Sequence, residues 1–188
     1  MTNYYALLEI PESLSPDPAL IEASWRDKNR SLSAEMEENG KTVSRHSDLN
    51  QARTTLTDPT SCLAHWLALR APSLTADRSI DPALMDLFAA ISPVIEATDA
   101  LLSRHRKATT ALARAIMTRE AINAQLKIQH LLQQIPPLRS PILDQFNAYE
   151  QEAATGSYQA ASKGLGQLKF LKRWEEQCRE RLLALIAC

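Results

Sequence analysis

The sequence predicts an all-α protein, and three observations lead to this prediction. Ala, Leu, Gln, Glu and Arg, which favour helices, dominate its 188 residues, whereas glycine occurs only 4 times. Apolar residues recur at intervals of three and four, which is the period of an amphipathic helix. Stretches rich in β-branched residues, which a sheet would need, are absent. We expect two helical parts, a domain over residues 1–71 and a helical bundle over residues 80–188.

The first part should contain four helices, which we expect at residues 3–10, 16–32, 43–56 and 60–69. Pro11 should end the first of them. Ser15 and Pro16 provide a cap and a first turn for the second helix. Asp58 and Pro59 separate the third from the fourth, because a residue that precedes proline avoids helical geometry. A polar loop that contains Gly40 should join the second helix to the third.

The second part follows a linker over residues 70–80 and opens with a long helix at Asp81-Pro82. Pro93 lies inside the apolar pattern of this helix, where a proline can bend it. Another helix must begin somewhere within residues 103–110. This stretch contains neither glycine nor proline, so the sequence leaves the position of the break open.

Prolines and a glycine divide the rest of the second part. Pro136-Pro137 should stop the second helix of the bundle, and Ser140-Pro141 should start the third. A turn at Gly156 then leads into a last helix over residues 158–185. Its apolar residues recur at about seven-residue steps, which is typical of the seam of a helical bundle.

Charge and cysteine content restrict the classes of function. The 21 basic and 22 acidic residues give a net charge of −1, without the basic excess that nucleic-acid binding needs. No run approaches the roughly 18 apolar residues of a membrane span, and the first residues do not resemble a signal peptide. The 3 scattered cysteines indicate reduced thiols. We therefore expect a cytoplasmic protein that binds neither nucleic acid nor membrane.

Three segments of the first part resemble a J-domain. Residues 3–11 (NYYALLEIP) resemble its short first helix, the basic helix over residues 16–32 its second, and residues 48–59 (DLNQARTTLTDP) its third. The resemblance implies contact with a DnaK/HscA-type chaperone through a His-Pro-Asp tripeptide and a basic face of the second helix. In this chain the tripeptide positions are Ser33, Ala34 and Glu35, and the basic face is Arg26, Lys28 and Arg30.

The lost tripeptide predicts weak or absent stimulation of the chaperone's ATPase. In the family the Asp contacts an arginine of the ATPase, and the Pro holds the loop. Glu35 keeps the negative charge of the Asp on a longer side chain, whereas Ser33 and Ala34 keep none of the chemistry of the His and the Pro. Removing one partner of a buried charge pair costs about 2–5 kcal/mol. Two alternatives stay open: a three-helix domain without J-domain ancestry, and a basic face that is simply solvated.

Both ends of the second part are similar to the C-terminal domain of HscB-type iron–sulfur co-chaperones. Residues 83–88 (ALMDLF) resemble the opening of that domain, and residues 158–173 resemble its closing signature. The resemblance implies that the bundle holds an iron–sulfur scaffold protein, or another client, through an apolar patch with an acidic fringe. By position these residues are Leu84, Met85, Phe88 and Phe170, with Glu96 as the acidic position that remains. An apolar stripe at helical spacing is equally compatible with a core.

The sequence shows no arrangement of residues that supports catalysis. Cys62 and His65 have a spacing found in metal sites, but no second pair accompanies them. Gly164 and Gly166 do not follow a strand, so they do not form a dinucleotide loop. We therefore expect no enzyme, no cofactor and no metal site. The leading hypothesis is a degenerate HscB-type co-chaperone, and the alternative is a helical protein–protein adaptor unrelated to iron–sulfur assembly.

Overall fold

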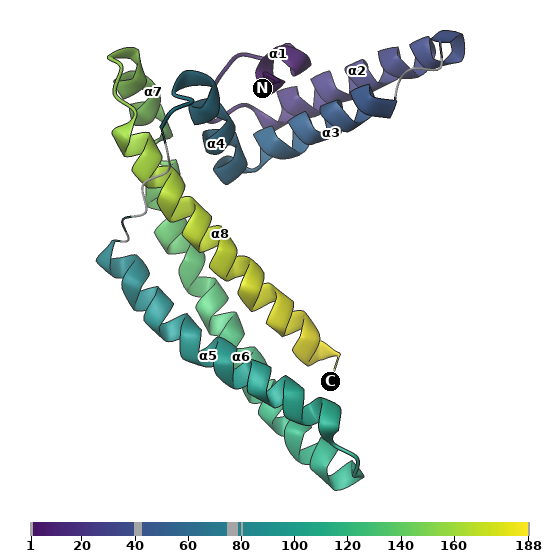
Figure 1. Cartoon of the computed structure of the whole chain (residues 1–188), viewed down its shortest axis with the longest axis vertical. Coiled ribbons are helices and arrows are strands. Elements are labelled where there is room, and N and C mark those ends of the chain that lie inside the picture. The colour runs from purple at the N-terminus through teal and green to yellow at the C-terminus, as the bar shows by residue number, and fades with distance from the viewer. Residues whose placement is uncertain (1, 40–42, 75–78, 80, 188) are drawn as a thin grey trace. The chain divides into compact units, whose positions relative to one another are not determined.

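The computed structural model describes residues 2–39, 43–74, 79 and 81–187, which form eight helices and no strand (Figure 1). The helices are α1 (Tyr4–Leu8), α2 (Pro18–Asn39), α3 (Val43–Thr57), α4 (Pro59–Arg70), α5 (Pro82–Lys107), α6 (Ala111–Leu143), α7 (Phe146–Ala154) and α8 (Gln159–Ile186). This confirms the prediction of an all-α fold.

The helices form two compact units, and neither is continuous in sequence. Unit 1 comprises Met1–Asp77 and Leu143–Leu165, and unit 2 comprises Arg78–Ile142 and Gly166–Cys188. Unit 1 therefore includes α7 and the start of α8 as well as the four N-terminal helices. The ranges 1–71 and 80–188 stay a prediction for the domains.

The helix boundaries in unit 1 follow from local capping groups. The Asn3 side chain accepts hydrogen bonds from the amides of Tyr5 and Ala6 at the start of α1. Helix α1 ends at Glu9, whose φ of 54° is left-handed, two residues before the expected terminator Pro11. The Asp58 side chain caps α4 by accepting from the Ser61 amide at 2.8 Å.

The core of unit 1 lies between α1, α2, α3 and α4. Helices α2 and α3 lie side by side (Figure 1), and α1 and α4 both contact α3. On α3 and α4 the apolar residues that recur at helical spacing are buried: Leu49, Ala52, Leu56, Leu63, Trp66 and Leu67. Their spacing of three and four residues puts them on one face of each helix.

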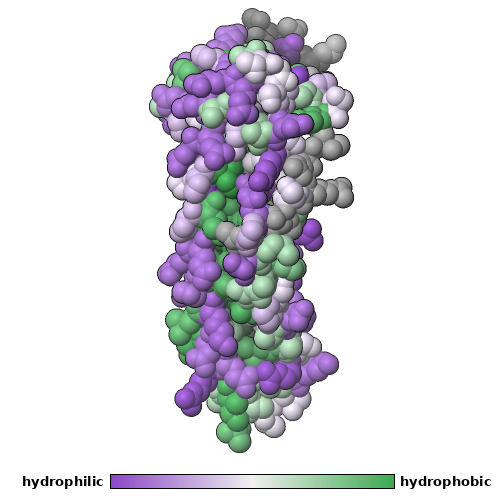
Figure 2. All heavy atoms as spheres, turned by 90° about the vertical axis from the view of Figure 1, so that its left-hand side faces the viewer, coloured by the Kyte–Doolittle hydropathy of each residue, from purple (hydrophilic) through white to green (hydrophobic). Residues whose placement is uncertain are grey.

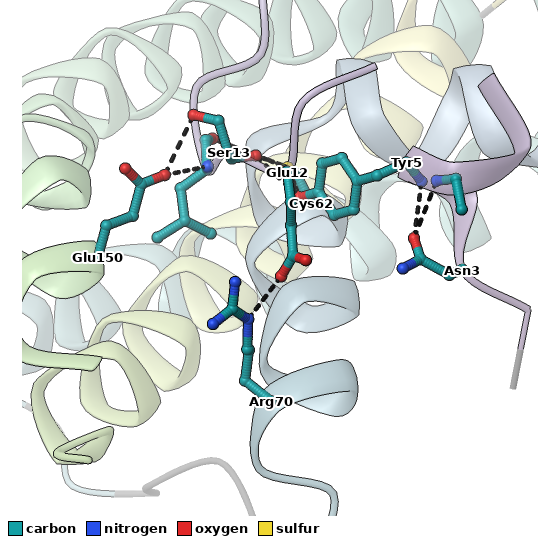
Figure 3. A network of polar contacts seen from close by, with 9 residues as sticks. Asn3, Tyr5, Glu12, Ser13, Cys62, Arg70 and Glu150 are labelled. Atoms are coloured by element: carbon teal, nitrogen blue, oxygen red, sulfur yellow. Dashed lines mark hydrogen bonds and ion pairs between the residues drawn. The ribbon is translucent and has the colours of Figure 1, made fainter. Parts of the chain in front are cut away.

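A network of polar contacts holds the segment after α1 against α4 and α7, all within unit 1 (Figure 3). The Tyr5 hydroxyl donates to the Ser13 carbonyl at 2.8 Å and lies 3.2 Å from the Cys62 sulfur. The Glu150 carboxylate, on α7, accepts from the Ser13 hydroxyl at 3.1 Å and from the Leu14 amide. Burial raises the pKa of the Cys62 thiol to about 11, so this thiol is protonated at neutral pH.

Gly164 allows α7 to approach α8 closely. A Cβ atom at this position would lie 2.6 Å from the Tyr149 hydroxyl oxygen, well inside van der Waals contact. The glycine lies in the helix interior, where it costs about 1 kcal/mol relative to alanine. The close packing of Tyr149 explains why a glycine occupies this position despite that cost.

Unit 2 consists of α5, most of α6 and the larger part of α8. Helix α5 ends at Lys107 and α6 begins at Ala111, so the break that the sequence left open lies at residues 108–110. The Thr110 hydroxyl accepts from the Ala113 amide at 3.2 Å and so caps α6.

The prediction that prolines divide the middle of the bundle is wrong. Helix α6 continues through Pro136, Pro137 and Pro141 to Leu143, and α5 likewise continues through Pro93. Each proline removes one backbone hydrogen bond, but the apolar face of α6 stays buried on both sides of them, at Ile135 and Ile142. Burial of this face outweighs the local preference to stop.

Candidate protein-interaction sites

The tripeptide positions lie inside a helix and not in a loop. The sequence predicted that the second helix ends at Leu32, but α2 continues to Asn39. Ser33 is exposed, and its hydroxyl donates to the Asn29 carbonyl one turn earlier, at 2.9 Å. The polar loop expected at residues 37–41 is helical as far as Asn39, and Gly40 and Lys41 lie outside the described residues, as do the side chains of Ala34 and Glu35. Ala and Glu are strong helix formers, which accounts for the extra turns.

The predicted basic face of α2 is partly neutralised within unit 1. Lys28 forms an ion pair with Glu9, just after α1. Arg30 lies 3.6 Å from Asp27 on its own helix, and both side chains are largely exposed. Arg26 is exposed. The cationic surface available to an acidic partner is therefore smaller than three basic side chains imply.

A cluster of polar and aromatic side chains around Arg53 joins α2 to α3, and sequence spacing did not predict it. The Arg53 guanidinium lies 4.4 Å from the ring centroid of Trp25 and pairs with Glu22. The Trp25 indole N–H donates to the Asn50 side chain at 3.0 Å. Contacts between residues of different helices need the relative rotation of the helices, which a single sequence does not provide.

The predicted patch of unit 2 divides into exposed and buried residues. Met85 is 50% exposed and Phe88 is 46% exposed, whereas Leu84 is only 3% exposed and belongs to the core. Phe170, on α8, is partly buried. Figure 2 shows apolar side chains reaching the surface of unit 2, where Figure 1 places α5 and α6.

Trp174 connects the two helices that carry this patch. Its ring stacks against Phe88 of α5 and against Phe170 of α8, with ring centroids 5.8 Å and 5.9 Å away. Trp174 is itself buried and therefore fixes both phenylalanines. The seven-residue apolar pattern of the last helix did not reveal this stacking. The position of Trp174 four residues after Phe170, one turn along the same helix, is the signal that could have linked them.

The charges beside the patch are mixed. Asp86 and Glu96 are exposed on α5, whereas Lys169 and Arg173 are exposed on α8 beside Phe170. The fringe is therefore acidic on one helix and basic on the other. A partner that covers the patch would need complementary charges of both signs.

Cys62 and His65, the residues with metal-like spacing, have structural contacts instead. The Cys62 sulfur contacts Tyr5, and His65 Nε2 accepts from the Tyr4 amide at 3.1 Å. In the part of the chain that the structure describes, no group of three or more His, Cys, Asp or Glu side chains could hold a metal ion. No helix within that part is both long and apolar enough to cross a bilayer.

Sequence comparison gives no match to a protein family and none to a curated protein. Structure comparison matches the chaperone HscB from Vibrio cholerae with a TM-score of 0.57 and 17% sequence identity. The match covers 95% of this chain and 96% of that chain. The chain has an HscB-like fold. At this identity the likeness establishes the fold alone, and it agrees with the resemblance that the sequence motifs carry.

Proposed function

We propose that this chain is a non-enzymatic, co-chaperone-like protein that binds a protein client through unit 2. The observation that carries the proposal is the aromatic group of Phe88, Trp174 and Phe170, with Met85 beside it, on an HscB-like fold. The resemblance of the sequence motifs makes an iron–sulfur scaffold protein the first client to test.

The patch has the composition of a binding hot spot. Aromatic residues and methionine are enriched where protein interfaces are fully desolvated. Phe88 is held by stacking on a buried tryptophan, so little side-chain entropy is lost when a partner covers it. Half-exposed aromatic and thioether groups on one helix gain free energy when a client removes them from water.

We further propose that stimulation of a DnaK/HscA-type ATPase is weak or lost. Residues 33–35, which the sequence resemblance aligns with His-Pro-Asp, lack its chemistry, and residues 40–42, which follow α2 in the sequence, lack it as well. Lys28 and Arg30 are paired with acidic residues of the chain itself, which weakens the basic face. The missing tripeptide and the weakened basic face favour the same conclusion.

Client binding is tested by calorimetric titration of an IscU-type scaffold into the full chain. We expect Phe88→Ala and Phe170→Ala each to weaken binding about tenfold or more, because they remove a desolvated aromatic contact. Leu183→Ala is the matched control, since Leu183 is also exposed on α8 but lies away from the aromatic group. Equal binding by all four proteins would overturn the patch assignment.

Loss of activation is tested in an ATPase assay with a DnaK-type chaperone. The wild-type chain should give little stimulation. The triple variant Ser33→His, Ala34→Pro, Glu35→Asp should also shorten α2, because a proline inside a helix costs about 3 kcal/mol. Circular dichroism controls for its folding. Strong stimulation by the wild type contradicts the proposal, and a folded triple variant that fails to stimulate removes the support for a J-domain.

One observation favours the alternative of a helical adaptor unrelated to iron–sulfur assembly. His-Pro-Asp is absent from residues 33–35 and also from residues 40–42, which follow α2 in the sequence, so unit 1 offers a partner the shape of the fold without that tripeptide. Absence of scaffold binding by the wild-type chain would favour this adaptor function.

A further inference from the structure

A groove of about 430 Å³ lies between α5 and α6 in unit 2, on a face of α5 different from the one that carries Phe88. Its walls are mainly aliphatic and include Val94, Ala97 and Leu101 from α5 and Ala124 from α6. Arg104, Glu120 and Lys127 line it as well, and Arg104 and Glu120 are paired with each other. The groove thus combines aliphatic walls with the positive charge of Lys127.

Helix α6 has apolar residues on two opposite faces. One face is buried in unit 2 and carries Ala121, Ile128, Leu131 and Ile135. The other carries four aliphatic residues that are between 51% and 74% exposed: Leu112, Ile116, Ile122 and Leu126. At about 100° per residue these four fall within one third of the helix circumference, and the groove runs beside them. We call these four residues the α6 stripe.

The same region holds an excess of positive charge. Residues 103–127 contain six basic residues, Arg104, Arg106, Lys107, Arg114, Arg119 and Lys127, against the single acidic residue Glu120, a net charge of +5. Since the whole chain carries −1, the remaining residues carry −6. Glu120 is paired with Arg104 at 2.7 Å, and Arg119 and Lys127 are exposed on α6.

We propose that the groove and the α6 stripe bind an acidic amphipathic helix of a protein partner. From Leu112 to Leu126 the stripe extends for about 21 Å, which matches about four turns of a second helix. Apolar side chains of that helix, at intervals of three and four residues, would cover the stripe and enter the groove. Its Asp and Glu residues would lie near the exposed Arg119 and Lys127, which precede and follow Ile122 along α6.

The charges favour an acidic helix over two other possible occupants, a second copy of the chain and a membrane surface. In a symmetric dimer the stripe would meet its own copy, which brings +5 next to +5 and is electrostatically unfavourable. A membrane-surface helix usually carries aromatic anchors, and residues 103–127 contain no Phe, Tyr or Trp. The −6 of the remaining chain would also oppose binding to an anionic bilayer.

Fluorescence anisotropy with a designed peptide tests the proposal on the full chain. The probe is a labelled four-turn helix with Leu at intervals of three and four residues and Glu on the flanks, and the matched control peptide carries Lys in place of Glu. We expect the Glu peptide to bind, with affinity that falls as salt rises, and the Lys peptide to bind at least tenfold more weakly. Equal binding of the two peptides would refute the charge argument.

Variants of the chain then locate the binding site. Arg119→Glu and Leu126→Ser should each weaken the Glu peptide about tenfold, whereas Leu183→Ser, at an exposed leucine of α8, should not. Equal effects of Leu126→Ser and Leu183→Ser would show nonspecific apolar binding and refute the site.

The other two occupants are tested in parallel. Self-association in sedimentation velocity that Leu126→Ser abolishes would replace the proposal with a second copy of the chain. Co-flotation with phosphatidylserine-containing vesicles that Leu126→Ser abolishes would replace it with a membrane surface. Arg119→Glu should leave scaffold binding unchanged and Phe88→Ala should leave peptide binding unchanged, so this proposal and the client-binding proposal fail independently.

Discussion

Units 1 and 2 differ in what they leave exposed to solvent. Among the described residues of unit 1, only Leu20 and Leu74 are large apolar residues with substantial exposure. Unit 2 has eight of them: Met85, Phe88, Leu112, Ile116, Ile122, Leu126, Leu183 and Ile186. Both units nevertheless have well-buried cores, with Leu63 fully buried in unit 1 and Leu168 and Leu171 in unit 2.

The difference shows where partners are expected to bind. In unit 1 the polar and charged groups near the α1–α2 connection are used to hold the unit together, through Tyr5, Ser13, Cys62 and Glu150. Unit 2 keeps exposed aliphatic and aromatic residues on two separate faces, and exposed apolar surface of this kind marks interaction sites. Unit 1 is thus the more self-contained of the two.

The largest expected effect comes from comparing the substitution of one leucine in each unit. Leu63→Ala removes a fully buried side chain of unit 1 and should lower the free energy of unfolding by about 2–5 kcal/mol. Leu126→Ala, on the exposed α6 stripe, should change it by no more than about 0.5 kcal/mol. Urea unfolding followed by circular dichroism measures both. A comparable loss from Leu126→Ala would show that the stripe is covered in the free protein.

The next effect tests the polar network of unit 1. Glu150→Ala leaves the Leu14 amide and the Ser13 hydroxyl without their acceptor, and should cost about 1–3 kcal/mol of unfolding free energy. Glu152→Ala is the control, because Glu152 is exposed on the same helix. If both variants lose the same small amount of unfolding free energy in urea, this network does not hold α7 within unit 1.

Much of this fold follows from local sequence, and the failures have a common physical cause. The turn at Asp58-Pro59 and the periodic apolar residues place α3 and α4 to within a few residues. The errors fall at Leu32, where α2 continues, and at Pro136-Pro137, where α6 continues. At these two positions the local preference of the sequence to end a helix was weak, or burial of an apolar helix face against the rest of the unit outweighed it.

The candidate sites were less predictable than the fold. Helical spacing placed Met85 and Phe88 on one helix, but it could not show that Leu84 points inward and that Trp174 joins Phe88 to Phe170. Helical spacing could not show that the α6 stripe is exposed, because an apolar residue at helical spacing is usually buried. Which of two apolar faces is exposed depends on how neighbouring helices pack, and that information is not local.

A smaller effect is expected where α7 meets α8. Gly164→Ala should gain about 1 kcal/mol of helix propensity but lose about 1–3 kcal/mol through the clash with the Tyr149 hydroxyl. The net change in unfolding free energy should therefore be a modest loss. Tyr149→Phe removes the oxygen at 2.6 Å, so Gly164→Ala should be better tolerated in that background. Equal losses in both backgrounds would rule out this contact as the reason for the glycine.

The smallest effect appears only on acidification and concerns His65. This residue is buried, its ring stacks on Tyr4 with centroids 4.4 Å apart, and its Nε2 accepts the Tyr4 amide, so Nδ1 carries the proton. Burial lowers the pKa of His65, an effect that the nearby Glu12 carboxylate partly opposes. Protonation would also turn the acceptor of the Tyr4 amide into a donor that faces it.

The direction of the pH dependence follows from that lowered pKa. Below about pH 6.5 the unfolded chain binds this proton more readily than the folded one, so His65 makes the folded state less stable as the pH falls and has no such effect above neutrality. We expect the urea concentration at the unfolding midpoint of the wild type to decrease when the pH is lowered from 7.5 to 5.5. This interval extends about one unit to either side of an ordinary histidine pKa. His65→Gln should reduce that change, because a glutamine oxygen can accept the Tyr4 amide without titrating. His130→Gln, at an exposed position, should leave it intact. The same pH dependence in wild type and His65→Gln would mean that α1 is not held through a neutral His65.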